Sequence, residues 1–221
     1  MIAAQLISDA IPPIKTSDTI QKVEDRMAEF RLNHLPIVNE TQFLGLISDE
    51  DIIEIPDYDT TVGNINLSLI NPFVYEDQHI YEVIRLFYEQ KLTAVPVLDS
   101  SMNYLGLISI NTLTEYFAKI TSVAEPGGII ILEISNRNNS LSHIAQIVES
   151  NNVQILSSYV DTVVNSTKLE ITIKVNKTDI SQIIASFLRY DYTVKATFNH
   201  LQRDNDSKDR FDSLMNYLSF D

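Results

Sequence analysis

Two blocks in the first half of the chain occur twice, separated by 60 or 61 residues. Residues 34–38 (HLPIV) are matched by residues 94–98 (AVPVL), and residues 43–48 (FLGLIS) are matched by residues 104–109 (YLGLIS). A repeat at a fixed period marks one structural unit that is used twice. The first half of the chain is therefore expected to fold as two similar units.

Apolar residues at helical spacing precede each block. They are Ile20, Val23, Met27 and Phe30 in the first copy and Ile80, Val83, Ile84 and Phe87 in the second. The preceding residue types predict a helix cap at Ser17 or Asp18 in the first copy and at Asp77 in the second. The central strands of the blocks, residues 35–38, 44–47, 95–98 and 105–108, are continuously apolar, as strands buried on both faces are. Each copy is thus expected to be a short strand, a helix, two strands and a second helix, starting near Asp49 or near Asn111.

Composition excludes several classes of protein. The 221 residues contain no Cys, which removes disulfides, thiolate metal sites and Cys nucleophiles. A net charge of −14 argues against nucleic acids and anionic membranes as partners, because binding phosphate needs clustered Lys and Arg. The N-terminus does not resemble a signal peptide, and the longest apolar run, residues 129–132, is far too short to span a membrane. We therefore expect a cytoplasmic protein.

The charge is divided unevenly along the chain. Residues 1–126 contain 19 acidic and 7 basic residues, whereas residues 127–221 contain 11 and 9. The change coincides with Pro126-Gly127-Gly128, a sequence typical of a domain boundary. The expected domains are residues 1–60, residues 61–122, a linker at 123–128, residues 129–200 and a helical tail at 201–221.

The repeated pattern over residues 1–120 resembles the CBS domain, and its two copies resemble a CBS pair, or Bateman module. That resemblance implies a pseudo-twofold pair with two clefts that can hold adenosine nucleotides or S-adenosylmethionine. It also implies a regulatory sensor rather than a catalyst. The ligand signature of the family, Gly-apolar-apolar-Ser/Thr-x-x-Asp, is complete at residues 45–51 (GLISDED), whereas Thr112 replaces the Asp in the second copy.

By this resemblance, Asp51 would bind the ribose hydroxyls and Ser48 would face the phosphate. The residues expected to line the base are Leu35, Pro36 and Ile37. The spacing of Ser48 and Asp51 is also that of a helix cap, so a purely structural role stays open. A hydroxyl is a poorer bidentate acceptor than a carboxylate, so the cleft that carries Thr112 is expected to bind weakly or not at all.

An acidic run follows the complete signature. Its members, between positions 49 and 59, are Asp49, Glu50, Asp51, Glu54, Asp57 and Asp59, with no Lys or Arg among them. This charge would repel a polyphosphate unless a cation compensates, and Lys15, His79 and Lys91 are the candidate compensators. AMP or S-adenosylmethionine is therefore favoured over ATP as an effector, and ADP is a further candidate. The run lacks the spacing of a calcium loop, so no metal site is predicted.

The second half alternates in the order βαββαβ, which is the ferredoxin-like pattern. The predicted strands are residues 129–135, 153–160, 168–176 and 192–198, and the predicted helices lie at 141–148 and, capped by Thr178-Asp179, at 180–188. After a CBS pair, this order resembles an ACT domain, and the whole resembles the acetoin-utilisation type of CBS–ACT protein. The first strand–helix loop, residues 136–140, has neither the Pro nor the Gly of amino-acid-binding ACT domains. A packing or dimerising role is therefore favoured over amino-acid binding.

No catalytic motif is present. The four His residues are far apart, and no nucleophile elbow occurs, so no catalytic residue and no resident cofactor are predicted. The expected protein is an α+β regulatory homodimer that senses an adenosine-type ligand and acts on a regulated protein not named by the sequence. The alternative is a ligand-free dimeric scaffold that recruits a partner enzyme. The tail, with Phe211, Leu214, Met215 and Leu218 at helical spacing, is expected to dock on its own or a partner's surface.

Overall fold

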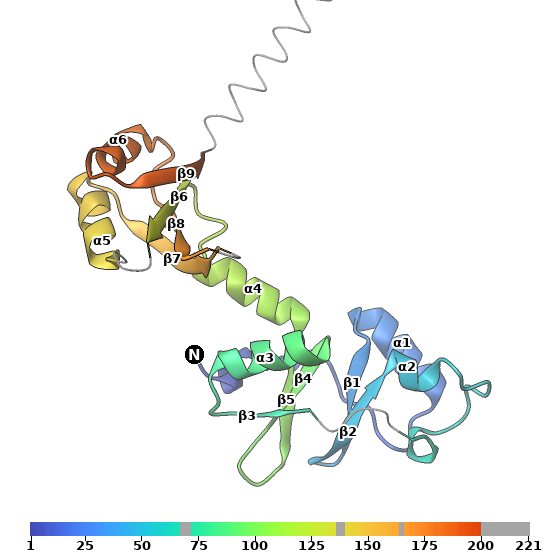
Figure 1. Ribbon diagram of the computed structural model, residues 1–221. Helices are drawn as coiled ribbons and strands as arrows, with labels where there is room; N and C mark the ends of the chain where they lie inside the picture. Colours follow the sequence, from blue (N-terminus) through green and yellow to red (C-terminus); the bar gives the residue numbers. More distant parts are fainter. Residues whose placement is uncertain (67–71, 136–139, 164–165, 200–221) are drawn as a thin grey trace, which may run out of the picture. The chain divides into compact units, whose positions relative to one another are not determined.

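The chain divides into two compact units, Met1–Tyr116 and Phe117–Asp221, called here the first and the second unit. The computed structural model describes residues 1–66, 72–135, 140–163 and 166–199. Both units mix helices and strands, as the α+β prediction requires (Figure 1). The predicted tail helix and most of the 136–140 loop lie outside the described residues. Within the described residues, no helix combines the length and apolar character needed to cross a membrane.

The first unit contains the two repeats. The first repeat consists of α1 (Ile20–Phe30), β1 (His34–Asn39), β2 (Gln42–Ser48) and α2 (Asp49–Ile52). The second consists of β3 (Val74–Tyr75), α3 (Ile80–Gln90), β4 (Ala94–Leu98), β5 (Tyr104–Ser109) and α4 (Ile110–Ile120). In both copies the two central strands pair antiparallel, and their register shifts at equivalent positions, between Ile37 and Val38 and between Val97 and Leu98. The repeat in the sequence is thus a repeat in the structure.

The short strand predicted before each helix forms fully only in the second repeat. There β3 pairs parallel with β4, whereas the first repeat has a single parallel bridge between Ile14 and Ile37. The second helices also differ, because α2 has 4 residues and α4 has 11. α2 starts at Asp49 as predicted, and α4 starts at Ile110, one residue before the predicted Asn111.

The predicted caps of the first helices were wrong. α1 is capped by Thr19, whose hydroxyl accepts a hydrogen bond from the Lys22 backbone N–H at 3.4 Å. Asp18 instead accepts from the backbone N–H of Lys15 at 2.9 Å. α3 is capped by His79, whose ring nitrogen accepts from the Tyr81 backbone N–H at 3.3 Å. Both helices begin one or two residues later than predicted.

Each repeat is completed by a short segment from the start of the other. The 3₁₀ turn η1 (Ala3–Leu6) lies at the beginning of the first copy, yet its apolar side chains pack in the core of the second copy. The turn η2 (Val62–Asn64) lies at the beginning of the second copy, and Val62 packs in the core of the first. Backbone hydrogen bonds from Ile80 to Met1 and from Val62 to Asp18 fix these exchanges. The two repeats therefore fold as one unit.

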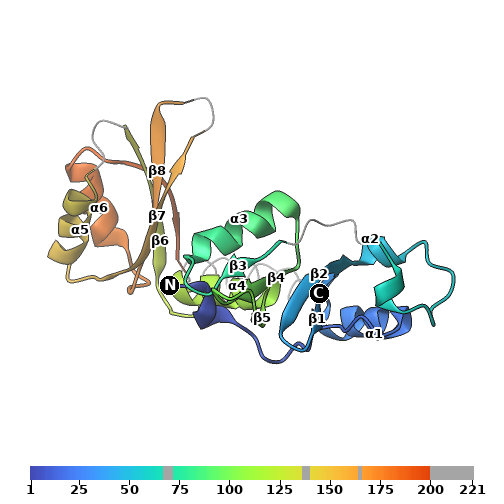
Figure 2. The same ribbon diagram turned by 90° about the horizontal axis from the view of Figure 1, so that it is seen from below.

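The second unit has the predicted βαββαβ order. Its elements are β6 (Gly128–Ser135), α5 (Leu141–Ser150), β7 (Ile155–Thr162), β8 (Lys168–Val175), α6 (Ser181–Arg189) and β9 (Thr193–Phe198). The antiparallel sheet has the strand order β7-β8-β6-β9, and α5 and α6 lie together on one of its faces (Figure 2). The helices and the sheet enclose one apolar core, which includes Ile130, Ile171 and Phe187.

Two elements of the second unit, β7 and α6, begin differently from the prediction. β7 begins at Ile155 rather than at Val153, which is buried in the core ahead of the strand. The Thr178-Asp179 cap was also wrong, because Ile180 holds the N-cap position and makes no side-chain hydrogen bond there. The Asp179 carboxylate accepts instead from the Ser181 backbone N–H at 3.1 Å.

Candidate functional site

Ser48 and Asp51 lie where β2 ends and α2 begins. The Asp51 Oδ2 atom accepts hydrogen bonds from the Ser48 backbone N–H at 2.8 Å and from the Ser48 hydroxyl at 2.7 Å. The Ser48 oxygen in turn accepts from the Asp51 backbone N–H at 3.3 Å. Because each side chain bonds the backbone of the other, the two residues form a capping box on α2. The structure thus brings together the two polar residues of the predicted site, in a geometry that already has a local role.

The second repeat contains the same cap without the carboxylate. The Ser109 and Thr112 hydroxyl oxygens lie 2.9 Å apart, and the Thr112 backbone N–H donates to the Ser109 oxygen at 3.1 Å. Ser48 and Ser109 are both buried. The two caps are therefore alike in geometry, and the negative charge of Asp51 is the chemical difference between them.

Leu35, Pro36 and Ile37, predicted to line the base, are all buried in β1. Leu35 and Ile37 pack in the apolar core of the first repeat, and the Pro36 carbonyl accepts from the Ile14 backbone N–H at 2.8 Å. In the strand pairing, Ser48 lies opposite His34, the neighbour of Leu35. The predicted residues therefore lie close along one hairpin, and a contact of the three β1 residues with a base stays a prediction.

His34 adds a partly buried polar contact between the repeats, opposite Ser48 in the strand pairing. Its Nδ1 atom accepts from the Thr93 backbone N–H at 3.2 Å and lies 3.0 Å from the Thr93 hydroxyl, which accepts from the Asn33 backbone N–H at 2.9 Å. Burial lowers the pKa of His34 below its usual value, although Asp49, Asp51 and Glu50 oppose this shift. His34 is thus hydrogen-bonded within the first unit. The contribution of Thr93 was missed, and its one signal is that it stands at the position of Asn33 in the repeat.

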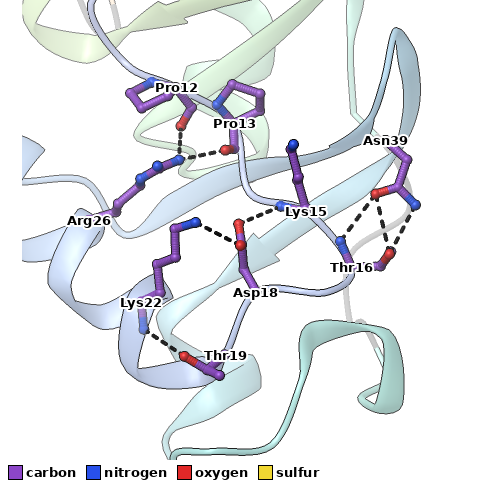
Figure 3. Close-up of polar contacts among 9 residues, drawn as sticks. All are labelled: Pro12, Pro13, Lys15, Thr16, Asp18, Thr19, Lys22, Arg26 and Asn39. Carbon is purple, nitrogen blue, oxygen red and sulfur yellow. Dashed lines mark hydrogen bonds and ion pairs between the residues drawn. The ribbon is translucent and has the colours of Figure 1, made fainter.

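The basic side chains near the start of α1 are engaged locally (Figure 3). The Arg26 guanidinium donates to the carbonyl oxygens of Pro12 and Pro13 at 2.9 and 2.5 Å, and the Lys22 ammonium pairs with Asp18 at 2.7 Å. Two of the three candidate compensating cations, His79 and Lys91, lie at the two ends of α3, and Lys91 sits 4.7 Å from the centre of the Tyr88 ring. His79 and Lys91 thus have contacts on their own helix.

The second unit contains a cavity of about 750 Å³, which the sequence did not indicate. Its described lining comprises Glu133, Ile134, Ser135, Ser140, His143, Lys168, Tyr190, Asp191, Tyr192 and Thr193. The Tyr192 hydroxyl lies 2.8 Å from His143 Nδ1, and the Lys168 ammonium pairs with Glu133. Among the described residues, no group of three or more His, Asp or Glu side chains is arranged to hold a metal ion.

Residues 3–58 and 64–119 each match the family model of the CBS domain. The chain belongs to the CBS domain family. The matched ranges follow the two structural repeats, so the predicted tandem CBS pair is confirmed. The two matches together cover half of the chain. The repeat, the two similar caps and the shared core all lie within the CBS pair.

Three individual proteins are similar to the chain at identities between 18% and 26%. A homoserine O-acetyltransferase of Methanococcus vannielii is 25% identical over 120 residues, which are 51% of this chain and 24% of that enzyme. The chain thus spans about a quarter of the length of this curated relative. A CBS domain pair/ACT domain protein of Thermotoga maritima is 26% identical, with a TM-score of 0.48 over 53% of this chain and 96% of that one. The protein CBSX2 in complex with AMP is 18% identical, with a TM-score of 0.45 over 54% of this chain and 97% of that one.

Proposed function

We propose that the chain is a regulatory protein whose CBS pair binds one adenosine-type ligand at the Ser48–Asp51 cap. The observation that carries this proposal is the difference between two otherwise matching caps. The family signature is complete where Asp51 stands and lacks its carboxylate where Thr112 stands. A carboxylate can accept hydrogen bonds from both hydroxyls of a ribose, which a single threonine hydroxyl cannot do.

The charge around the cap supports a ligand with little negative charge. Asp49 and Glu50 are exposed on α2, and the basic groups nearest to α1 are engaged with Asp18 and with backbone carbonyls. The repulsion between like charges acts most strongly on the ligand with the most phosphates. AMP, ADP and S-adenosylmethionine are therefore proposed as effectors ahead of ATP.

The second unit is proposed to be ACT-like and to hold a homodimer that passes the ligand signal to a regulated protein. Its βαββαβ order supports this role, and so do the outer strands β7 and β9, whose free edges can pair with another strand. A CBS pair followed by such a unit is also the arrangement expected of the acetoin-utilisation type. Transmission requires that the ligand stabilise one arrangement of the two units over another.

A ligand-free dimeric scaffold that recruits a partner enzyme is the second candidate. Two observations favour it. Asp51 already caps α2 through Ser48, and the residues proposed to line the base are buried in the core. In this case the CBS pair would serve only as a rigid support for a protein interface.

Thermal unfolding of the full chain with AMP, ADP, S-adenosylmethionine and ATP separates the two candidates. A ligand at about 100 times its Kd adds about 2.7 kcal/mol to native-state stability and raises Tm. Asp51→Ala is expected to abolish the ligand-induced rise. Thr112→Ala is the matched control, because it removes the contact between the Ser109 and Thr112 hydroxyls of the other repeat and should keep the rise. The absence of any rise with all four compounds would support the scaffold.

A further inference from the structure

The antiparallel sheet of the second unit has one face covered by α5 and α6 (Figure 2) and a second face, called here the open face. Residues that stand directly opposite each other in antiparallel strands point to the same side of a sheet. The strand register therefore aligns two rows on the open face, each with one residue from β7, β8, β6 and β9. The first row consists of Tyr159, Thr172, Ile131 and Ala196, and the second consists of Ser157, Lys174, Ile129 and Phe198.

The two rows form an apolar patch that is open to solvent at both edges of the sheet. Tyr159 on β7 and Phe198 on β9 are 55% and 56% exposed. Ile129 and Ile131, on the inner strand β6, are half-buried. Lys174 is the one charged member of the rows, and its ammonium donates to the backbone carbonyl of Ser122. A sheet with apolar side chains on a face normally buries that face against another layer, so the open face is a surface on which a further segment can pack.

Paired charges border the patch on the inner strands. Glu133 and Glu170 stand opposite each other in the next row of the register. Glu133 pairs with the Lys168 ammonium. Glu170 pairs with the Lys195 ammonium. An apolar segment that packs on the two rows therefore meets no unpaired carboxylate of β6 or β8.

The chain itself contains a segment that suits this patch. The tail, residues 201–221, follows β9 closely and lies outside the described residues. Apolar residues recur in its sequence at helical spacing, which predicts a single apolar stripe. The members of the stripe are Phe211, Leu214, Met215 and Leu218.

Charge and chain length both fit the tail to the open face. Between positions 211 and 220 the sequence has one charge, Asp212, which is opposite in sign to Lys174. The twelve residues between Phe198 and Phe211 can span about 40 Å when extended. The sheet measures about 14 Å from β9 to β7, since neighbouring strands lie about 4.8 Å apart. The stripe can therefore reach every strand of its own sheet.

We propose that the apolar stripe of the tail packs on the open face of its own second unit. Its own sheet is favoured over that of a second copy, because a tethered segment meets its own binding surface at a far higher effective concentration. The tail then controls whether another protein has access to the open face. This contact does not depend on whether the CBS pair binds a ligand.

A single tryptophan tests the contact, because the natural chain contains no Trp. In the full chain, Phe211→Trp is expected to emit at a shorter wavelength and to be quenched less by acrylamide than the isolated peptide of residues 200–221 with the same substitution. Adding Phe198→Ser and Tyr159→Ser should raise the quenching to the level of that peptide. Leu188→Ser is the matched control, because Leu188 lies on α6 and is 57% exposed, and it should leave the quenching unchanged.

Three results would overturn the proposal. Quenching of the Phe211→Trp chain as strong as that of the peptide would show that the stripe is not buried. Unchanged quenching after Phe198→Ser and Tyr159→Ser would place the stripe elsewhere. An effect of Leu188→Ser as large as that of the other pair would show that the reporter does not respond to the open face.

A mixing experiment separates the chain's own tail from the tail of a second copy. The Phe211→Trp chain is refolded with an excess of full-length chain that carries Phe198→Ser and Tyr159→Ser. A tail on its own sheet stays protected in this mixture. Stronger quenching in the mixture would show that the tail packs on the sheet of another copy, and the proposal would be wrong.

Urea unfolding provides a measurement that needs no reporter. In the full chain, Phe198→Ser and Tyr159→Ser remove contacts with the tail and should lower the unfolding midpoint of the second unit. In a chain that ends at Asn199 the same pair should lower it clearly less, because the two changes act on one contact. Equal losses in the two chains would contradict the proposed packing.

Discussion

Tyr104, the first residue of β5, carries a buried hydroxyl that has no hydrogen-bond partner in the described part of the chain. A buried polar group left without a partner costs about 1–3 kcal/mol. The equivalent residue of the first repeat is Phe43, at an offset of 61 residues, so the same strand position is filled there without a hydroxyl. We therefore expect Tyr104→Phe to stabilise the first unit by about 1 kcal/mol, at the low end of that range because the ring and its packing stay.

Tyr104 also predicts how the stability of the first unit changes at alkaline pH. Burial raises the pKa of Tyr104 well above its usual 10.0, so the unfolded chain loses this proton at a lower pH than the folded chain. The stabilisation that results is fully present below pH 10 and is lost above it, by about 1.4 kcal/mol for each pH unit. Tyr104→Phe removes this loss, so its advantage over the wild type should grow as the pH rises above 10.

Urea denaturation, followed by a probe of the first unit at pH 8 and again above pH 10, measures both effects. A gain of about 1 kcal/mol corresponds to a rise of about 4 °C in Tm for a unit of this size. Tyr58→Phe, which removes a hydroxyl from a half-exposed ring in the same unit, should change neither value. A lower stability of Tyr104→Phe at pH 8 would show that the hydroxyl has a favourable partner, and the reasoning would be refuted.

Three further substitutions test other parts of the first unit. Gly106→Ala should destabilise the first unit by about 3 kcal/mol in urea denaturation, because the new Cβ would lie 2.3 Å from Ile7 Cγ2 and Gly106 has a φ of +151°. Gly63→Ala is the control and should cost clearly less, because its new Cβ would have its nearest contact at 3.2 Å. Thr112→Asp should raise the stoichiometry of AMP in isothermal titration from one to two, and an unchanged value of one would show that the carboxylate is not what separates the clefts. Because burial lowers the pKa of His34, its contribution to stability is complete above the usual pKa of 6.5 and falls as the pH drops below that value. His34→Gln should therefore reduce the loss of stability at acid pH. Parallel curves of stability against pH for the variant and the wild type would assign that loss to other groups.

The elements of both units could be predicted because their signals are local. The four central strands of the first unit are short apolar runs with a glycine at the matching position of each hairpin, and the βαββαβ order follows from alternating periods. The caps could not be placed, because Ser17, Asp18 and Thr19 are all good capping residues and stand in sequence. The choice follows from other bonds of Asp18, since its carbonyl accepts from the distant Val62 backbone N–H and its carboxylate pairs with Lys22.

The exchange of the 3₁₀ turns could not be predicted at all. η1 contributes only Ala3 and Leu6 to a core whose other members begin at Leu46, and no periodicity links residues so far apart. The contact of His34 with Thr93 is of the same kind, because it joins residues 59 positions apart through one ring nitrogen. Local patterns carry no information on which repeat a short segment will complete.

The candidate site was predictable to the same extent. Ser48 and Asp51 meet because a capping box depends on a spacing of three residues, which the sequence shows directly. Whether a base can reach Leu35, Pro36 and Ile37 depends on how the two repeats are packed, and the sequence does not contain that. The burial of these residues was predicted from their continuously apolar strand, whereas the cavity of the second unit beside His143 was not predicted.

A duplicated domain supplies its own comparison. Positions that are equal in both copies, such as Pro36 and Pro96 or Ser48 and Ser109, are those that form the shared hairpin and cap, so the fold explains them. Random change on an exposed surface explains ordinary polar differences between the copies, because such positions barely affect stability. Among the unequal positions, the Asp51–Thr112 pair lies at the start of the second helix of each repeat, and this is where the ligand is proposed to bind.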